Sequence, residues 1–471
     1  MGSATLAPPR PQSPIVRLRE APRAAGTRIT GWVLAGLVGA GIALRCWDLG
    51  GRPLNLDESF EALTARRPIG ELFGYLAHHD TAPPLTYLLR APFVAISQSD
   101  VMARLPSVLC SCAALALFAW WMRRRGIFGV VGVALFAFDA FQIHYGREAR
   151  MYALLELVGV VGAMVAEAWL RSPRRAHLVL VAAFGTVAVF THVAAFLFLA
   201  GLLTLVGTRR DRDAWWWRAA LAVPGLLFAA LWGPQFLQQL HNDHQPGART
   251  SWHALADVVG SQVTTDTALH GLLFVAVAVG GVVLVRKHRV LGRVWLACFV
   301  APLVAAAVLG LATDFLLPRV LTLGAWGPLV ALAVLVEEAA ARWRALGVAA
   351  AAVVLVVVVC AGVREPSRTG PADAAVAQLR VVTRPGDVVT VRPFWLEPLI
   401  DWNLGTREPQ PPAQTRNSVI PDAHELVVGG RAPTGRVWLL EPVDDRWFAR
   451  DSDACAPPWS DGVSRLRCLI R

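Results

Sequence analysis

The sequence predicts a polytopic α-helical membrane protein with a small C-terminal α/β domain outside the cytoplasm. Of the 471 residues, 55% are hydrophobic and only 17% are charged. About eleven stretches approach the ~20 apolar residues that cross a bilayer. Arginines gather in short clusters between these stretches. An ordinary soluble chain carries about 25% charged residues, so the composition disfavours a soluble or a disordered protein.

The membrane domain is expected at residues 29–363, after a Pro- and Arg-rich leader at 1–28 that we expect to be a disordered cytoplasmic tail. A cleaved signal peptide does not fit the leader, because the first apolar run is long and lacks a small-residue cleavage site. The expected spans are 29–47, 104–122, 127–143, 152–170, 177–191, 193–206, 219–236, 267–285, 294–313, 320–337 and 346–363.

Charge fixes the orientation. Basic clusters at 123–125, 171–175, 209–212, 286–289 and 342–344 fall on one side of these spans, which the positive-inside rule makes cytoplasmic. The net charge of +11 therefore indicates a membrane rather than nucleic acid. The apolar stretch 82–98 is interrupted by Arg90 and would invert every later span if it crossed. We expect it to lie in the interface as an amphipathic helix.

An odd number of spans places residues 364–471 outside the cell membrane. They predict a domain with helices at 371–384 and 394–403 and strands at 387–391 and 436–440. An oxidising compartment would allow a disulfide between Cys455 and Cys468. The tryptophans of this domain could stack on sugars or belong to its core: Trp395, Trp402, Trp438, Trp447 and Trp459.

Two polar motifs occur in the outer loop 48–103. Asp57 and Glu58 are adjacent carboxylates beside the bilayer, and either they carry chemistry or Asp57 caps a helix running to Arg66. His78, His79 and Asp80 precede a Pro-Pro turn. They could form a polar rim for a substrate or metal, or a solvated turn.

Two further motifs place arginines on the outer face, against the positive-inside bias. Arg147 and Arg150 follow the third span and would share a face if they lay on one helix. Paired guanidinium groups suit a phosphate, although a pair with Glu148 or a lipid headgroup is an equal alternative. Arg319 precedes a late span. His192 is expected to be a satisfied buried histidine.

These motifs together resemble the GT-C superfamily of membrane glycosyltransferases. The nearest branch contains protein O-mannosyltransferases and lipid A aminoarabinose transferases. The resemblance is carried by Asp57-Glu58 in a long first outer loop, Pro83-Pro84-Leu85 further along it, Arg104-Leu105-Pro106, the segment Arg147 to Tyr152, and Pro318-Arg319. It covers nearly the whole chain, and the order of the motifs makes it more specific than any one of them.

The resemblance implies transfer of a sugar from a polyprenyl-phosphate donor to a hydroxyl of an envelope glycan, lipid or protein. Asp57 would be the general base, and direct attack would invert the anomeric carbon. Glu58 would hold structure or the acceptor. The donor phosphate would be bound by Arg147, Arg150, Tyr152 and Arg319.

Some relatives bind a divalent metal near the active site. The sequence shows no strong ligand set, so we expect no strict metal requirement. Two departures concern the donor site: Ala82 stands where many relatives have histidine before Pro-Pro, and Val320 stands where many have tyrosine. Donor contacts at these two positions are therefore open.

A transporter or lipid flippase is the rival class, and an inactive envelope scaffold is a third. Transporters usually show inverted repeats and broken helices in matching halves, and the sequence shows neither. Ionisable residues collect at the outer face rather than inside the spans, apart from Glu156 and Glu167. Replacing Asp57 by asparagine should abolish transfer but not transport or scaffolding.

Overall fold

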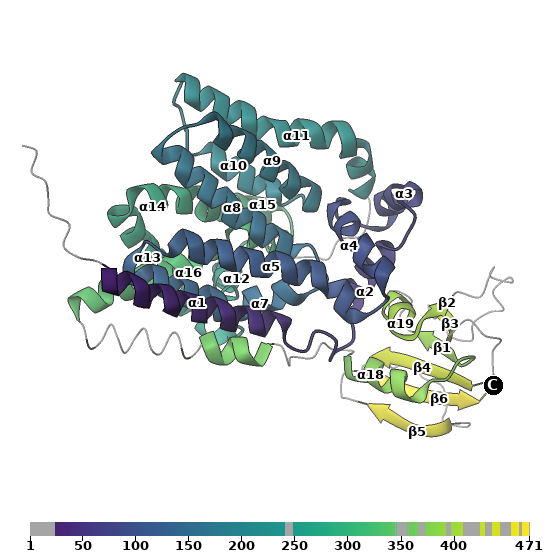
Figure 1. Ribbon diagram of the computed structural model, residues 1–471. Helices are drawn as coiled ribbons and strands as arrows, with labels where there is room; N and C mark the ends of the chain where they lie inside the picture. The colour runs from purple at the N-terminus through teal and green to yellow at the C-terminus, as the bar shows by residue number, and fades with distance from the viewer. Residues whose placement is uncertain are drawn as a thin grey trace, which may run out of the picture.

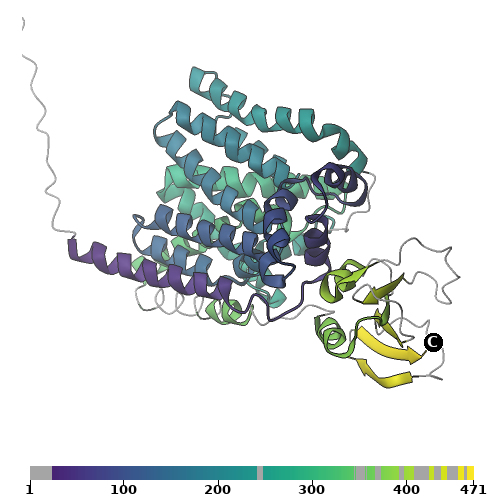
Figure 2. The ribbon, with the colours of Figure 1, turned by 45° about the vertical axis from the view of Figure 1, so that its right-hand side comes forward.

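The structure is a computed structural model that describes residues 24–240 and 248–343, and beyond these 345, 356, 358–365, 373–391, 397–407, 424–428, 436–442, 454–460 and 464–470. Helices run side by side in one bundle, and a smaller domain with a β-sheet lies at one end of it (Figures 1 and 2). The predicted cytoplasmic tail falls almost wholly outside the described residues, as does most of the last expected span.

The order of elements follows the predicted spans, with additional short helices in the outer loop. The helices are α1 Ala24–Cys46, α2 Leu56–Thr64, α3 Ile69–His79, α4 Leu85–Ile96, α5 Asp100–Met122, α6 Gly126–Phe138, α7 Ala140–Arg147, α8 Tyr152–Arg171, α9 Arg175–Thr191, α10 Ala195–Leu203, α11 Arg212–Gln239, α12 Trp252–Gly260, α13 His270–Lys287, α14 Arg289–Trp295, α15 Ala301–Ala312 and α16 Trp326–Arg342. Short 3-10 turns, η1 Thr267–Leu269 and η3 Pro318–Gly324, precede α13 and α16, and a π turn, η2 Leu296–Val300, joins α14 to α15.

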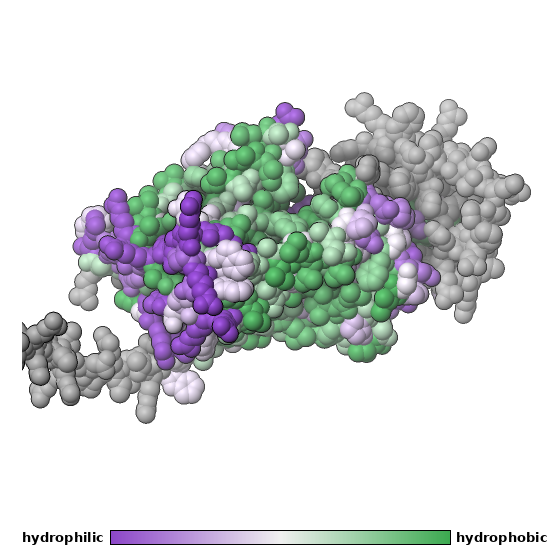
Figure 3. Space-filling model, turned by 90° about the horizontal axis from the view of Figure 1, so that it is seen from above, coloured by the Kyte–Doolittle hydropathy of each residue, from purple (hydrophilic) through white to green (hydrophobic). Residues whose placement is uncertain are grey.

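The chain is a multi-pass membrane protein. Among the described residues, five helices are long and apolar enough to cross a bilayer, or up to seven if the bent pairs α6–α7 and η3–α16 each count as one span. Shorter apolar helices cover 31–46, 85–96 and 175–191. A hydrophobic band lies between two hydrophilic ends of the molecule in Figure 3. Lipid is the solvent that suits such a band.

The predicted basic loops meet at the end of the bundle far from the sheet domain. Glu167 on α8 accepts hydrogen bonds from Trp121 at 2.6 Å and from Arg125, next to the end of α5. Glu338 on α16 is paired with Lys287 at the end of α13 and with Arg342 at 2.9 Å. The loops that follow α5, α8, α13 and α16 therefore share one face, as the charge pattern requires.

The expected span 127–143 is broken by 48° between α6 and α7. Asp139 begins α7 by accepting the Gln142 amide at 3.0 Å. The break frees backbone carbonyls, which lipid cannot satisfy. The fully buried Arg45 of α1 donates to the carbonyls of Phe136 and Ala137 at 3.1 and 3.0 Å. An arginine within the first span thus stabilises the kink.

The outer loop folds into α2, α3 and α4 at the end that carries the sheet domain (Figure 1). The stretch 82–98 forms α4, which buries Thr86, Tyr87, Arg90 and Val94 on one side. Gln239 at the end of α11 donates to the carbonyls of Leu76 and Ala82 at 3.2 and 3.0 Å. A long bundle helix therefore fixes the turn that precedes Pro83.

The C-terminal residues form a mixed sheet with two helices, α18 Asp373–Val382 and α19 Glu397–Leu404, close to the predicted elements. The strand order is β2-β3-β1-β4-β6-β5, and β1 pairs with β4 in parallel. The strands are β1 Val388–Val391, β2 Thr406–Arg407, β3 His424–Val428, β4 Arg436–Pro442, β5 Ala454–Ser460 and β6 Ser464–Ile470.

Buried positions of this domain include two of the five tryptophans. Trp438 donates to Asp387 at 3.0 Å and Trp402 donates to Asp100 at 2.8 Å, so neither is available to stack on a sugar. The other three tryptophan side chains lie outside the described residues. The side chains of Cys455 and Cys468 also lie outside them, so the disulfide stays a prediction.

Candidate active site

Helix α2 begins beside the bilayer with a capping box. The Asn55 side chain accepts the Glu58 amide at 2.9 Å, and Glu58 accepts the Asn55 amide at 3.0 Å. The helix is therefore capped by Asn55 and ends at Thr64, so the interpretation of Asp57 as the cap of a helix running to Arg66 is wrong. Because two other residues satisfy the end of the helix, the Asp57 side chain is left 35% exposed.

Glu58 is held in a bidentate ion pair. Its oxygens accept from Nε and Nη2 of Arg104, each at 2.8 Å, and both side chains are 1% exposed. The Ala149 amide donates to the same carboxylate at 2.8 Å. Burial would raise the pKa of Glu58, but the Arg104 guanidinium outweighs it and holds the pKa at about 2. Glu58 therefore joins the start of α2 to α5 and to the segment before α8.

Arg104 also determines the path of the chain between α1 and α2. Its guanidinium donates to three backbone carbonyls, those of Leu49 at 2.7 Å and of Arg52 and Pro53 at 2.9 Å. The one side chain thus satisfies a buried loop and its carboxylate partner together. The placement of Asp57 at the outer face rests on this rigid base.

Arg150 lies against the exposed carboxylate of Asp57. Its guanidinium is 3.8 Å from Asp57 Oδ2 and 3.7 Å from Glu61 Oε2. Glu61 lies one turn after Asp57 on α2 and is 1% exposed. Burial lowers the pKa of Arg150, but Asp57 and then Tyr152 and Glu61 more than offset this and raise it above its usual value. The group is therefore a permanent cation beside the candidate base.

Arg90 of α4 is a second cation beside the Glu61 carboxylate. It donates to Glu61 at 3.0 Å and to the Ala103 carbonyl, and its side chain is 2% exposed. Glu61 is thus shared between Arg90 and Arg150, and it links α2, α4 and the segment before α8.

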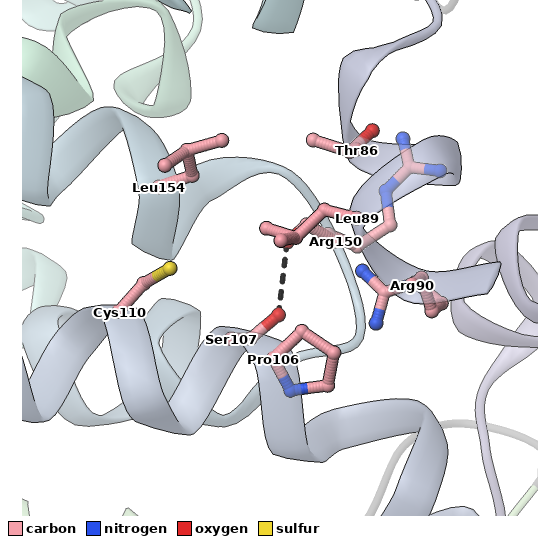
Figure 4. Close-up of a pocket in the computed structure, with 8 residues that line it drawn as sticks. All are labelled: Thr86, Leu89, Arg90, Pro106, Ser107, Cys110, Arg150 and Leu154. Carbon is pink, nitrogen blue, oxygen red and sulfur yellow. Dashed lines mark hydrogen bonds between the residues drawn. The ribbon is translucent and has the colours of Figure 1, made fainter. Parts of the chain in front are cut away.

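A small cavity lies between α4, α5 and the start of α8 (Figure 4). Ser107 on its floor donates to the Arg150 carbonyl at 3.1 Å. Three of the lining residues carry a buried donor without a partner in the described part of the chain: Thr86 Oγ1, Arg90 Nε and Arg150 Nε. Buried donors in folded proteins are nearly always paired. The cavity measures about 10 Å³, the room of one water molecule, and three unpaired donors surround it.

Arg319 approaches the same region from η3. Arg319 and Arg150 are both close enough to interact electrostatically with the same three side chains, Tyr145, Tyr152 and His192. The approach is close because α8 has glycine at 159, where a Cβ atom would lie 1.9 Å from the Leu323 carbonyl oxygen. The structure thus brings together Asp57, Arg150, Tyr152 and Arg319 of the predicted set.

Arg147 is separated from Arg150. Helix α7 ends at Arg147 and α8 begins at Tyr152, so the two arginines do not lie on one helix and do not share a helical face. Arg147 is 3% exposed and donates to the carbonyls of Trp47 and, at 3.3 Å, Asp48 at the end of α1. This places Arg147 on the α1 side of α7, where it stabilises the fold.

Of the three residues predicted to form a substrate rim, two lie away from the site and one lies in it. His78 and His79 are exposed in the last turn of α3, where their ring nitrogens contact the carbonyls of Gly74 at 2.8 Å and Tyr75 at 3.0 Å. Asp80 instead accepts from Tyr87 of α4 and from the Thr81 amide at 2.7 Å. Burial raises the pKa of Asp80 although Arg150 acts in the opposite direction. Only Asp80 of the three belongs to the site.

The acidic side chains of the site lie against arginines. Within the described ranges, no three His, Cys, Asp or Glu side chains come together as a possible ligand set. The candidate carboxylates Asp57, Glu58 and Glu61 are instead paired with guanidinium groups.

Two residues of the site do not belong to the predicted set: Glu61 and Arg90. Glu61 lies four residues after Asp57, so a helix from Leu56 would have placed both on one face. The only sequence signal at Arg90 is that it interrupts an apolar stretch. His192 follows α9, and its Nδ1 accepts the Ala194 amide at 3.0 Å, as expected of a satisfied histidine. No local sequence signal places it beside two arginines.

The three-dimensional arrangement matches solved membrane proteins, although no family model and no curated protein matches the sequence. ArnT from Cupriavidus metallidurans in the apo state superposes with a TM-score of 0.58 at 14% identity, over 94% of this chain and 98% of ArnT. The chain shares the fold of ArnT. ArnT bound to undecaprenyl phosphate gives a TM-score of 0.53 at 14% identity over 93% and 98% of the two chains. Arabinosyltransferase EmbB from Mycobacterium smegmatis gives 0.42 at 15% identity over 68% and 32%.

Proposed function

We propose that the protein is a glycosyltransferase that moves a sugar from a polyprenyl-phosphate donor to a hydroxyl group of an envelope acceptor. The observation that carries the proposal is the partly exposed Asp57 carboxylate 3.8 Å from Arg150, whose side chain is 13% exposed and lines a cavity with other unpaired donors. A base beside a fixed cation is what acyl- or glycosyl-group transfer to a hydroxyl requires. The shared fold with ArnT, one structure of which holds undecaprenyl phosphate, supports the lipid carrier.

In the reaction, Asp57 takes the proton of the acceptor hydroxyl as its oxygen attacks the anomeric carbon. The carbon–oxygen bond to the donor phosphate breaks, and its electron pair stays on the phosphate oxygen. Arg150 and Arg319 stabilise the negative charge that develops there. A single direct displacement inverts the anomeric carbon. The sugar is a hexose or a pentose, and the chemistry of the site is compatible with both.

The donor phosphate is proposed to bind beside the Arg150 guanidinium, where Thr86 and Arg90 supply further buried hydrogen-bond donors. The cavity of Figure 4 measures about 10 Å³, the room of one water molecule, so its walls move apart to admit the phosphate. Helix α4 forms one wall of the cavity and exposes Leu89 and Ile96, at 38% and 75%. The polyprenyl chain would lie along this apolar side, in the hydrocarbon layer. No divalent metal is required in this scheme, since guanidinium groups supply the positive charge.

We further propose eleven spans in the plasma membrane, with the N-terminus in the cytoplasm and the C-terminal domain outside. The contacts between the basic loops after α5, α8, α13 and α16 support this orientation, because all of them lie at the end opposite to Asp57. The acceptor is then reached from outside the membrane.

A transporter would use ionisable groups buried within its spans. The buried Arg45 and Glu156 are such groups, and Ser111 links them at 2.9 and 3.3 Å. However, the Nη1 and Nη2 groups of Arg45 donate to a carbonyl of its own helix and to carbonyls at the kink that ends α6. This fixed bridging role favours structure over transport.

The test is a deletion strain that receives empty vector, wild type, Asp57→Asn or Asp211→Asn, with membrane levels matched by immunoblot. Asp211 is a matched control, because it pairs with Arg209 at 2.7 Å and caps α11 at the basic end. Mass spectrometry of envelope glycans and glycolipids should show a sugar increment that wild type and Asp211→Asn restore and Asp57→Asn does not. Full restoration by Asp57→Asn would exclude Asp57 as the base and favour a transporter or scaffold.

A further inference from the structure

The C-terminal domain contacts α2, the helix that carries Asp57. Helix α19 packs directly on α2, and the two are side by side in Figure 1. Leu56, the residue before Asp57, packs on the apolar core of the domain together with Leu404 of α19. The first turn of α2 is therefore covered by a part of the chain more than three hundred residues away in sequence.

A polar cluster joins the two parts beside this apolar contact. Asp100, the first residue of α5, is 8% exposed and accepts from Trp402 Nε1 at 2.8 Å and from Arg380 at 2.9 Å. Arg380 also donates to Asn403 Oδ1 at 2.5 Å. The three domain residues are thereby arranged around one membrane-domain carboxylate.

Asn403 carries the contact onward to the start of α2. Its Nδ2 donates to the Leu54 carbonyl at 3.2 Å and to the Leu399 carbonyl at 2.6 Å. Leu54 is fully buried and precedes Asn55, the capping residue of α2. The domain thus bonds to the backbone only three residues before Asp57.

We propose that the C-terminal domain positions the general base, and that Asp100 and Asn403 are its positioning residues. Helix α2 has nine residues, too few to be stable without tertiary contacts. Glu58 fixes it on the bundle side, and the domain fixes it on the outer side. A displacement of a reacting group by about 1 Å can lower a reaction rate ~10²-fold. A poorly fixed α2 would displace Asp57 and therefore slow sugar transfer. The inference rests on the proposed function, since it assigns Asp57 as the base.

Hydrogen exchange on the full-length protein in detergent tests the mechanical part without a known substrate. Asn403→Ala and Asp100→Asn should each speed exchange of the α2 amides about tenfold or more, the effect of one lost hydrogen bond. Asp100→Glu keeps the charge, so its α2 amides should exchange more slowly than those of Asp100→Asn. Amides of β1 should keep their protection, since the domain remains folded. Asp211→Asn, which alters an aspartate–arginine pair at the basic end, should leave α2 unchanged.

The functional part is tested with two readouts on the same variants. Binding of undecaprenyl phosphate should keep its affinity, since the proposed phosphate donors lie on α4 and in the segment before α8 rather than on α2. Restoration of the envelope sugar increment in the deletion strain should fall about tenfold or more. This split between binding and transfer separates a positioning role from general damage.

The proposal fails if α2 exchanges at the wild-type rate in Asn403→Ala, or if α2 loosens and transfer stays at the wild-type level. A parallel loss of undecaprenyl phosphate binding and transfer would also overturn it, because general disruption would then explain both. These outcomes differ from failure of the proposed function, in which Asp57→Asn itself restores the sugar increment.

Discussion

Replacement of Glu58 by glutamine is the perturbation whose magnitude follows most directly from the structure. The carboxylate accepts four hydrogen bonds, two from Arg104 at 2.8 Å, one from Ala149 at 2.8 Å and one from Asn55 at 3.0 Å. Glutamine has the same shape as glutamate, but only one of its two terminal atoms is an oxygen that can accept hydrogen bonds. Its amide group would face the donors of the other oxygen.

The expected cost is that of breaking a buried ion pair. A charge-assisted hydrogen bond contributes about 1.5–3 kcal/mol. Glutamine also leaves the 1%-exposed Arg104 without a counter-charge, and removing one partner of a buried pair costs about 3–5 kcal/mol in all. At 1.36 kcal/mol per factor of ten, local opening of α2 should become about 10²- to 10⁴-fold more frequent.

Hydrogen exchange of the full-length protein measures this opening at the Ser59 amide, which donates to the Asn55 carbonyl at 2.8 Å. Protection should fall by the factor above in Glu58→Gln. The control is Glu71→Gln, because Glu71 is exposed on α3. The Ser59 amide of this variant should exchange at the wild-type rate. A loss of protection smaller than about tenfold in Glu58→Gln would refute the reasoning, since the pair would then add little to the stability of α2.

Three further predictions concern pH, the donor cation and helix packing. The depressed Glu58 pKa of about 2, against an ordinary 4.5, gives stability that is present above pH 4.5 and lost as pH falls through 2. Melting temperatures of wild type and Glu58→Gln should therefore converge below pH 4.5, and a constant gap would contradict this. Arg150→Met should reduce transfer ~10²–10³-fold with Arg150→Lys intermediate, as envelope mass spectrometry can measure; equal activity of Met and Lys variants would argue against a charge role. Gly159→Ala forces a Cβ atom to within 1.9 Å of the Leu323 oxygen and should lower the melting temperature, whereas Gly36→Ala, with open space around it, should not.

Helices were predictable from the sequence because hydrophobicity and loop charge are local properties. The expected spans 104–122 and 152–170 correspond to α5 and α8 almost residue for residue. The kink at Asp139 was not predictable, since it depends on Arg45 from another helix satisfying the freed carbonyls. Apolar composition alone does not reveal where a span bends.

The candidate site was predictable in part. Asp57 and Arg150 stand in polar motifs at helix ends, where the sequence marks them as unusual. Arg147 has the same local signal but faces the end of α1, because α7 stops before the second arginine. Arg90 and Glu61 appear as ordinary surface charges until tertiary packing buries both against each other. The distinction between a ligand-binding and a structural arginine is therefore made by tertiary contacts.

The central claim is that Asp57 drives sugar transfer from a lipid carrier, and the pool of lipid-linked sugars tests it most directly. Polyprenyl-phosphate sugars would be quantified by mass spectrometry in the deletion strain carrying wild type, Asp57→Asn or Asp211→Asn at equal membrane levels. The account predicts that one lipid-linked sugar accumulates with Asp57→Asn and empty vector and stays low with wild type and Asp211→Asn. An identical pool in all four strains would contradict it.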